Sequence, residues 1–138
     1  MEYLIDGYNI IRSTYFKKWE ESEKKVIFYE ILGKYKAKHP SIIFTVVFDG
    51  FKSEDFSLLR DKRIKTIFSG NITADEYIKR RTEKGKRNDE VTVVSDDRQV
   101  QISSKLFGCK TLSVSEFMMI VNYSKPDKTK GNKGNGSL

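Results

Sequence analysis

The sequence contains very few of the residues on which most metal and redox sites depend. Among 138 residues there is one cysteine, Cys109, and one histidine, His39. A single cysteine excludes an intramolecular disulfide framework and a zinc site built from several cysteines. A single histidine excludes a multi-histidine metal site and argues against a Ser-His-Asp triad. Any bound metal ion must therefore be held by oxygen ligands.

Long apolar runs are also missing. No segment approaches the ~18 consecutive apolar residues that a membrane-spanning helix needs. The N-terminal residues, MEYLIDGYN, do not show the basic and apolar regions of a secretory signal. Hydrophobic residues make up 38% and charged residues 33% of the chain, which is apolar enough for one core. We therefore expect a single domain that does not span a membrane.

Positive charge is in excess, with 26 Lys and Arg against 19 Asp and Glu, so the formal net charge is +7. Residues 79–87 carry six positive residues and one negative residue. Such a segment is typical of proteins that bind polyanions, although a solvated helix face has the same pattern. The candidates for contacts with RNA phosphates are Lys79, Arg80, Arg81, Lys84 and Arg87.

The C-terminal residues differ in composition from the rest. Residues 124–138 contain four lysines and one aspartate, and lack large apolar residues before the final Leu138. A segment that cannot bury apolar surface does not order itself. We expect a domain over residues 1–123 and a basic, disordered tail over residues 124–138.

Short runs rich in β-branched and aromatic residues indicate strands. Two of them, Ser41–Phe48 and Val91–Val94, are almost continuously apolar, which is typical of parallel strands buried on both faces. Helical patterns alternate with these runs, so the order predicts a three-layer α/β fold with a mostly parallel central sheet. The expected strands are Tyr3–Ile5, Ser41–Phe48, Arg63–Phe68, Val91–Val94 and Cys109–Leu112.

Apolar spacing and capping signals predict the helices. Thr73–Glu76 and Ser113–Glu116 both have the S/T-x-x-E form of a capping box, and Gly108 is a plausible C-terminal stop. A looser helical pattern lies between Phe51 and Lys62. The expected helices run from Ser22 to Tyr35, from Thr73 through Ile78, from Val100 to Phe107 and from Ser113 to Val121.

Aspartates follow three of the expected strands. They are Asp6, Asp49 and Asp96, and a fourth, Asp75, lies in the first turn of the helix after the third strand. Because ligands of a parallel sheet bind beyond the carboxyl ends of its strands, we expect these carboxylates at one edge. Carboxylates a few Å apart repel by on the order of 1 kcal/mol or more per pair. A divalent cation removes that penalty, and Mg²⁺ prefers oxygen ligands.

Each of these polar residues also has a simpler explanation. Asp6 could cap a turn, Asp49-Gly50 is a common strand-exit turn, and Asn9 could cap the next helix. Glu76 could serve only the capping box, and Asp97 could be favoured by a helix dipole alone.

The motifs, taken in order, resemble the NYN domain, and more closely its YacP-like branch within the PIN-like nuclease superfamily. That branch includes ribosome-associated bacterial mRNA endonucleases. The resemblance runs from about Tyr3 to Phe117 and implies a PIN-like sheet, a cytoplasmic setting and an RNA-cleaving site that uses Mg²⁺ or Mn²⁺. The motifs that carry it are Asp6-Gly7-Tyr8-Asn9-Ile10-Ile11, Phe48-Asp49-Gly50, Thr73-Ala74-Asp75-Glu76, and Ser95-Asp96 followed by Gln99.

The resemblance also implies roles for individual residues. Asn9 would orient Asp6 or contact the phosphate, and Ser95 would position Asp96. The implied catalytic residues are Asp6, Asn9, Asp49, Asp75 and Asp96. The implied metal ligands are Asp6, Asp75 and Asp96, with Glu76 and Asp97 as further candidates.

The interpretation is therefore a metal-dependent endoribonuclease that hydrolyses RNA, with mRNA on the ribosome as the substrate that the resemblance suggests. One alternative is a PIN-like module that binds RNA or the ribosome without cutting, although carboxylates repel phosphates unless a cation intervenes. Another is a phosphoryl-accepting receiver domain. The sequence lacks the paired acids after the first strand and the late lysine that a receiver uses.

Overall fold

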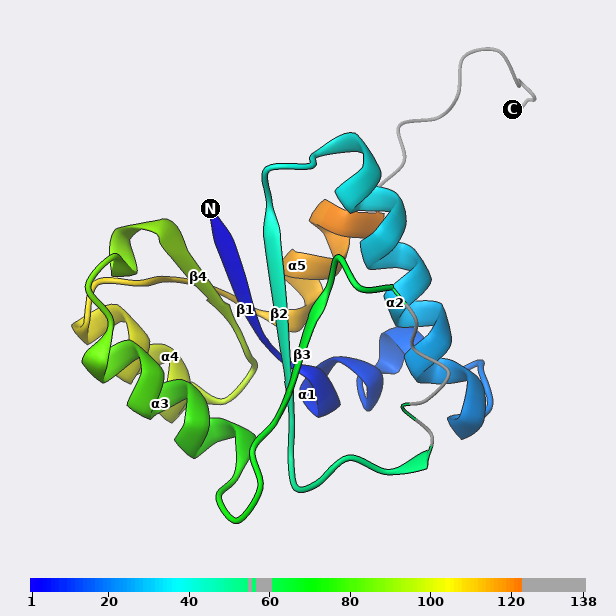
Figure 1. Ribbon diagram of the computed structural model, residues 1–138, viewed down its shortest axis with the longest axis horizontal. Helices are drawn as coiled ribbons and strands as arrows, with labels where there is room; N and C mark the ends of the chain where they lie inside the picture. Colours follow the sequence, from blue (N-terminus) through cyan, green and yellow to red (C-terminus); the bar gives the residue numbers. More distant parts are fainter. Residues whose placement is uncertain (55, 57–60, 123–138) are drawn as a thin grey trace.

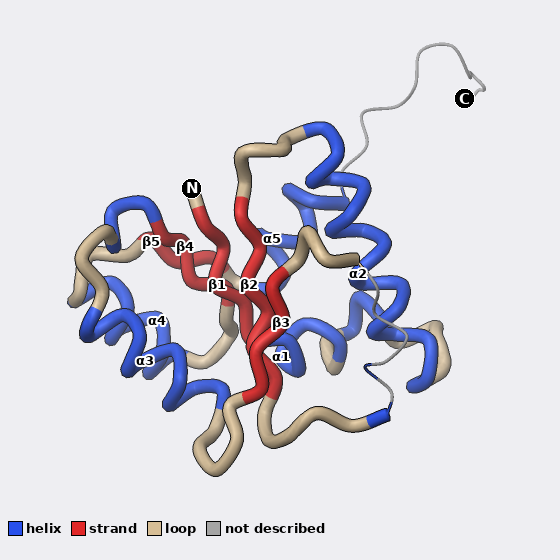
Figure 2. Tube along the Cα trace, in the orientation of Figure 1, coloured by secondary structure: helices blue, strands red, loops and turns tan. Residues whose placement is uncertain are grey.

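A computed structural model describes residues 1–54, 56 and 61–122 of the protein. Within these residues, one five-stranded sheet has the order β3-β2-β1-β4-β5, and every neighbouring pair is parallel. Helices cover both faces (Figures 1 and 2). The predicted three-layer α/β fold is confirmed. The strands are β1 (Glu2–Asp6), β2 (Ile43–Phe48), β3 (Lys65–Phe68), β4 (Val91–Val94) and β5 (Lys110–Leu112).

The helices form two groups on either side of the sheet (Figure 1). Helices α1, α2 and α5 pack on one face, and α3 and α4 pack on the other. No helix in the described ranges has both the length and the apolar character needed to cross a bilayer. The helices are α1 (Gly7–Ile11), α2 (Glu21–Lys38), α3 (Ala74–Lys84), α4 (Arg98–Leu106) and α5 (Val114–Asn122), with 3-10 turns η1 (Thr14–Phe16) and η3 (Asn88–Glu90).

The alternation of side chains along the central strand explains the two layers. Tyr3 and Ile5 of β1 join the core under α2 and α5, whereas Leu4 joins the core under α3 and α4. All three are buried. Successive side chains of a strand point to opposite faces, so a continuously apolar strand needs cover on both.

The predicted strands are present with ends shifted by at most two residues, and Val91–Val94 is unchanged. Helix α2 extends three residues beyond the predicted Tyr35. Helix α1 was not predicted, because five residues are too few to show a helical period. The tail over 124–138 lies outside the described residues, as does part of the looser pattern between Phe51 and Lys62.

Of the two predicted capping boxes, one forms both of its hydrogen bonds and the other forms only one. Ser113 and Glu116 exchange both hydrogen bonds, at 2.8 and 3.0 Å. Thr73 accepts the Glu76 N–H at 3.1 Å, but the Glu76 carboxylate pairs with Arg80 instead. A further box, which we did not predict, opens α2 at Glu20.

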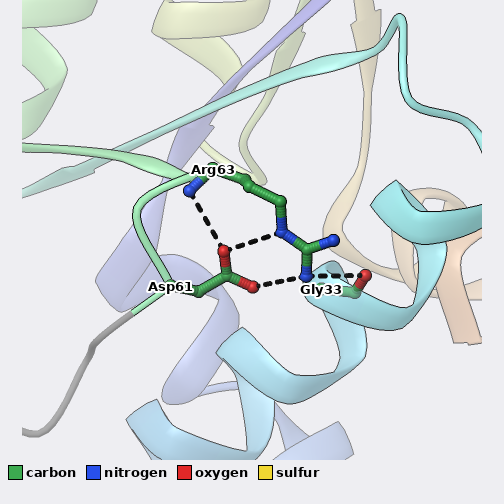
Figure 3. A network of polar contacts seen from close by, with 3 residues as sticks. All are labelled: Gly33, Asp61 and Arg63. Carbon is green, nitrogen blue, oxygen red and sulfur yellow. Dashed lines mark hydrogen bonds and ion pairs between the residues drawn. The ribbon is translucent and has the colours of Figure 1, made fainter.

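A polar cluster connects the segment before β3 to α2 (Figure 3). The Arg63 guanidinium donates to both carboxylate oxygens of Asp61, at 2.8 and 3.0 Å, and to the Gly33 carbonyl at 3.4 Å. The pair is partly exposed, so water and salt screen it and its contribution to stability is small.

Gly7 allows α1 to begin directly against the core. A Cβ built on Gly7 would lie 2.5 Å from Cε1 of Phe48, whose ring is fully buried. The Phe48 ring also packs edge-to-face on Tyr8, with centroids 5.1 Å apart. A side chain larger than hydrogen at this position must therefore displace the core beneath the start of α1.

We expect Gly7→Ala to lower the free energy of unfolding by about 1–3 kcal/mol, as overpacking does elsewhere. Gly33→Ala is the matched control. There the new Cβ meets the end of the flexible Asp61 side chain, and alanine has the higher helix propensity. Urea denaturation measures both variants. Equal stabilities of the two would contradict the proposed contact with Phe48.

Candidate functional site

Four aspartates line one hollow of about 420 Å³ at the carboxyl edge of the sheet. Asp6 is the last residue of β1, and Asp96 follows β4, the strand beside it. The sheet continues from β1 to β2 on one side and from β4 to β5 on the other, so the hollow lies at the switch point of the topology. The lining residues are Asp6, Tyr8, Asn9, Arg12, Ser13, Asp49, Thr73, Asp75 and Asp96.

The carboxyl groups of Asp6 and Asp75 lie close enough to interact directly. Two ionised carboxylates at this range repel each other, so the pair favours retaining a proton when no cation is present. Asp6 is only 6% exposed. Burial raises the pKa of Asp6 to about 7, and its interaction with the Asp75 carboxyl, to which a protonated Asp6 can donate, acts in the same direction. The Asn9 N–H lowers this pKa, whereas the charges of Asp75 and Asp49 raise it.

Burial also raises the pKa of Asp75, and the charges of Asp97 and Asp49 act in the same direction. Asp75 therefore interacts with two other acids, Asp6 and Asp97. Asp6 and Asp75, together with the acids whose charges raise their pKa values, form a set of four: Asp6, Asp49, Asp75 and Asp97.

Three of the aspartates at this edge also accept a backbone N–H at the start of a helix. Asp49 accepts the Ala74 N–H at the start of α3. Asp97 accepts the Val100 N–H of α4 at 3.0 Å, and Asp96 accepts the Val114 N–H of α5 at 2.9 Å. All three therefore have a structural role at the start of a helix, which the sequence did not predict for Asp49 and Asp96. A carboxylate has two oxygens, so capping through one does not exclude a second role.

Asn9 connects the two central strands at this edge. Its Oδ1 accepts the Asp96 N–H at 2.6 Å, and its own N–H donates to Asp6 Oδ1 at 3.2 Å. Asp6, rather than Asn9, is thus the N-cap of α1. Ser95 is fully buried and accepts the Asp97 N–H at 3.0 Å, which fixes the turn that follows β4.

Mg²⁺ and Mn²⁺ suit this set of donors, because every candidate ligand is an oxygen. A dication between Asp6 and Asp75 would replace the shared proton and remove the repulsion between them. No three acidic, histidine or cysteine side chains of the described ranges converge closely enough to hold an ion by themselves. The pair fits a site with two protein carboxylates, because Mg²⁺ typically fills its remaining positions with water and phosphate oxygens.

The structure places the other predicted ligands differently. Asp96 lines the hollow but directs Oδ1 at the start of α5. Glu76 lies outside the hollow and pairs with Arg80 at 3.1 Å. Asp97, predicted only as a further candidate, interacts directly with Asp75.

The predicted basic segment leads away from the hollow. Arg81 binds the carboxylate of Glu2, at the amino end of β1, through both terminal nitrogens. Arg87 pairs with Glu90 at 2.6 Å and is also at that opposite edge. The arginines of the basic segment therefore form ion pairs with nearby carboxylates.

Arg12 was not predicted from the sequence as a residue of this site. Its guanidinium carbon lies 4.5 Å from the centroid of the Tyr8 ring, and both residues line the hollow. Arg12 is four residues after Tyr8, the spacing at which helical side chains meet. The signal was therefore present, but it needed the short helix α1 to be recognised.

The sequence matches the family model of the YacP-like NYN domain over residues 3–136. The match continues beyond Phe117, where the motifs end, and includes most of the expected tail. It decides against a receiver domain. No curated protein matches the sequence.

The structure is similar to two crystal structures of Rae1 (YacP) from Bacillus subtilis. One is of a point mutant, with a TM-score of 0.69 and 23% identity, and the similarity covers 88% of this chain and 74% of that one. The other has a TM-score of 0.68 and 24% identity with the same coverage. At these identities the comparison shows a common fold. Because the family model matches almost the whole sequence, the protein belongs to the YacP-like NYN domain family.

Proposed function

We propose that the protein is an endoribonuclease that requires Mg²⁺ or Mn²⁺ and hydrolyses phosphodiester bonds of RNA at the hollow around Asp6. The observation that carries the proposal is the contact between the buried Asp6 and Asp75 at the switch point of the sheet. Membership of a family with a nuclease-type fold supports it. Messenger RNA, including mRNA on the ribosome, is the proposed substrate, which implies a cytoplasmic setting.

In this proposal Asp6 and Asp75 hold the cation, and Asp49 and Asp97 add negative charge beside them. Asp96 and Asn9 complete the site, with Glu76 at its margin. When bound, the cation activates water and neutralises the charge that develops on the phosphate. The water oxygen bonds to phosphorus in line, the bond to the 3′ oxygen breaks, and that oxygen takes a proton. The products are 5′-phosphate and 3′-hydroxyl ends.

The basic residues of α3 are proposed to contact phosphates farther along the RNA. Arg80 and Lys84 line an open groove along this helix, together with Tyr77 and Arg81. Lys79, Arg81 and Arg87 would extend this positive surface toward the opposite edge of the sheet.

The alternative is a module that binds RNA or the ribosome without cutting. One observation favours it: Asp49, Asp96 and Asp97 each have a structural role as helix caps. A cleavage assay separates the two functions.

We expect the full chain to cut a single-stranded RNA in Mg²⁺ or Mn²⁺ and to be inactive in chelator. Asp6→Asn and Asp75→Asn should lower the rate roughly 100-fold or more, because a bound cation stabilises the transition state by several kcal/mol. Asp89→Asn, an exposed acid on η3, is the control and should cut normally. Gel analysis of end-labelled RNA measures the rates. Binding without cleavage in either metal would establish the alternative.

The raised pKa of Asp6 predicts how stability depends on pH without metal. Its pKa is about 7 in the folded protein and has the ordinary value of 3.8 when unfolded, so between these values the folded state binds more protons. Stability should therefore fall as the pH rises from about 4 to 7, by at most about 4 kcal/mol. Asp6→Asn should remove much of this fall.

Urea denaturation at several pH values in chelator measures this dependence. Adding Mn²⁺ above pH 7 should restore stability to the natural protein and much less to Asp6→Asn, because the cation replaces the proton. A stability that is insensitive to Mn²⁺ would argue against a cation between Asp6 and Asp75.

A further inference from the structure

Two cationic side chains lie over the ring of Tyr8. The Arg12 guanidinium carbon lies 4.5 Å from its centroid, and Lys25 Nζ lies 5.5 Å away. Lys25 is also 5.0 Å from the centroid of Phe56. Tyr8 belongs to α1, Arg12 follows its last residue, and Lys25 lies in the first half of α2. These two helices pack on the opposite face of the sheet from α3 (Figure 1).

Arg12 is the one positively charged residue that lines the hollow in the described part of the chain; four of the other lining residues are aspartates. An acidic hollow repels the phosphates of a nucleic acid, so a strand can approach only where positive charge offsets this repulsion. A guanidinium also fits a phosphate better than an ammonium does, because its planar fork donates two parallel hydrogen bonds.

The ion pairs of the described residues distinguish Arg12 from the arginines of the basic segment. Arg80, Arg81 and Arg87 each pair with a carboxylate. Arg12 is exposed and forms no ion pair with any described residue. Its charge is therefore available to a ligand without breaking an existing pair.

The position of Arg12 is fixed by the core. The Arg12 N–H donates to the Tyr8 carbonyl at 3.0 Å, which closes the last turn of α1 and brings the two side chains together. Tyr8 packs edge-to-face on the fully buried Phe48, with centroids 5.1 Å apart. A guanidinium held over a rigid ring loses less conformational freedom when it binds a ligand.

We propose that Arg12, held over Tyr8, binds an RNA phosphate that flanks the one to be cleaved. Lys25 extends this positive surface, so the strand reaches the hollow over α1 and the start of α2. The inference rests on the proposed function and adds a substrate-positioning residue and a direction of approach.

The test compares Arg12→Gln with Lys38→Gln. Both variants remove one positive charge, but Lys38 is an exposed residue in the last turn of α2, at the other end of that helix from Lys25. Binding of a fluorescein-labelled single-stranded RNA is measured by anisotropy over a series of NaCl concentrations, and cleavage is measured in Mn²⁺. Thermal melts confirm that each variant is folded.

We expect Arg12→Gln to weaken RNA binding and raise KM by about tenfold or more, which corresponds to the loss of charge-assisted hydrogen bonds. The slope of log affinity against log salt should decrease by about one, and kcat should change much less than KM. Arg12→Lys should restore the slope but only part of the affinity. Lys38→Gln should show neither effect.

If Arg12→Gln binds RNA with the same affinity and salt slope as Lys38→Gln, the inference is wrong, even if the natural protein cuts RNA. If the natural protein does not cut, the proposed enzymatic function is wrong, and the binding comparison still decides whether Arg12 contacts the strand. The two failures therefore have different signatures.

Discussion

The contact between two acidic side chains, Asp6 and Asp75, is the constraint on which the carboxyl edge of the sheet depends. Asp6 is buried at the end of the central strand, where an ionised carboxylate costs several kcal/mol unless a partner compensates it. Besides the Asn9 N–H, the side chain that interacts with Asp6 is another acid, so without a cation the pair favours retaining a proton. A dication bound between the two carboxyl groups would therefore stabilise this edge, and burial of Asp6 increases the advantage of binding one.

The hydrophobic core determines where this edge lies and how rigid it is. Phe48 is buried beneath Gly7, and its ring supports Tyr8, which in turn supports Arg12. Packing in the interior therefore reaches the surface through the rings of Phe48 and Tyr8. On the other side, Asn9 joins the ends of β1 and β4, so that the two strands cannot move apart without breaking a hydrogen bond.

The sequence predicted most of the fold because its strands are apolar on both faces and end at polar turns. The same pattern located Asp6, Asp49, Asp75 and Asp96 at one edge, where they line a single hollow. It did not predict which carboxylates touch. That depends on rotamers and caps: Asp96 turns toward α5, while Asp97 interacts with Asp75. It also missed Arg12, since five residues of helix are too few to show a period.

The basic segment shows why charge along a sequence is a weaker guide than charge in space. Residues 79–87 have a large positive excess, yet Arg81 binds Glu2, a residue far away in the sequence. A single arginine outside any basic run, Arg12, lies instead beside the aspartates of the hollow. Binding of a polyanion depends on whether a positively charged side chain already has a partner and on how close it lies to the site. Only the folded chain reveals both.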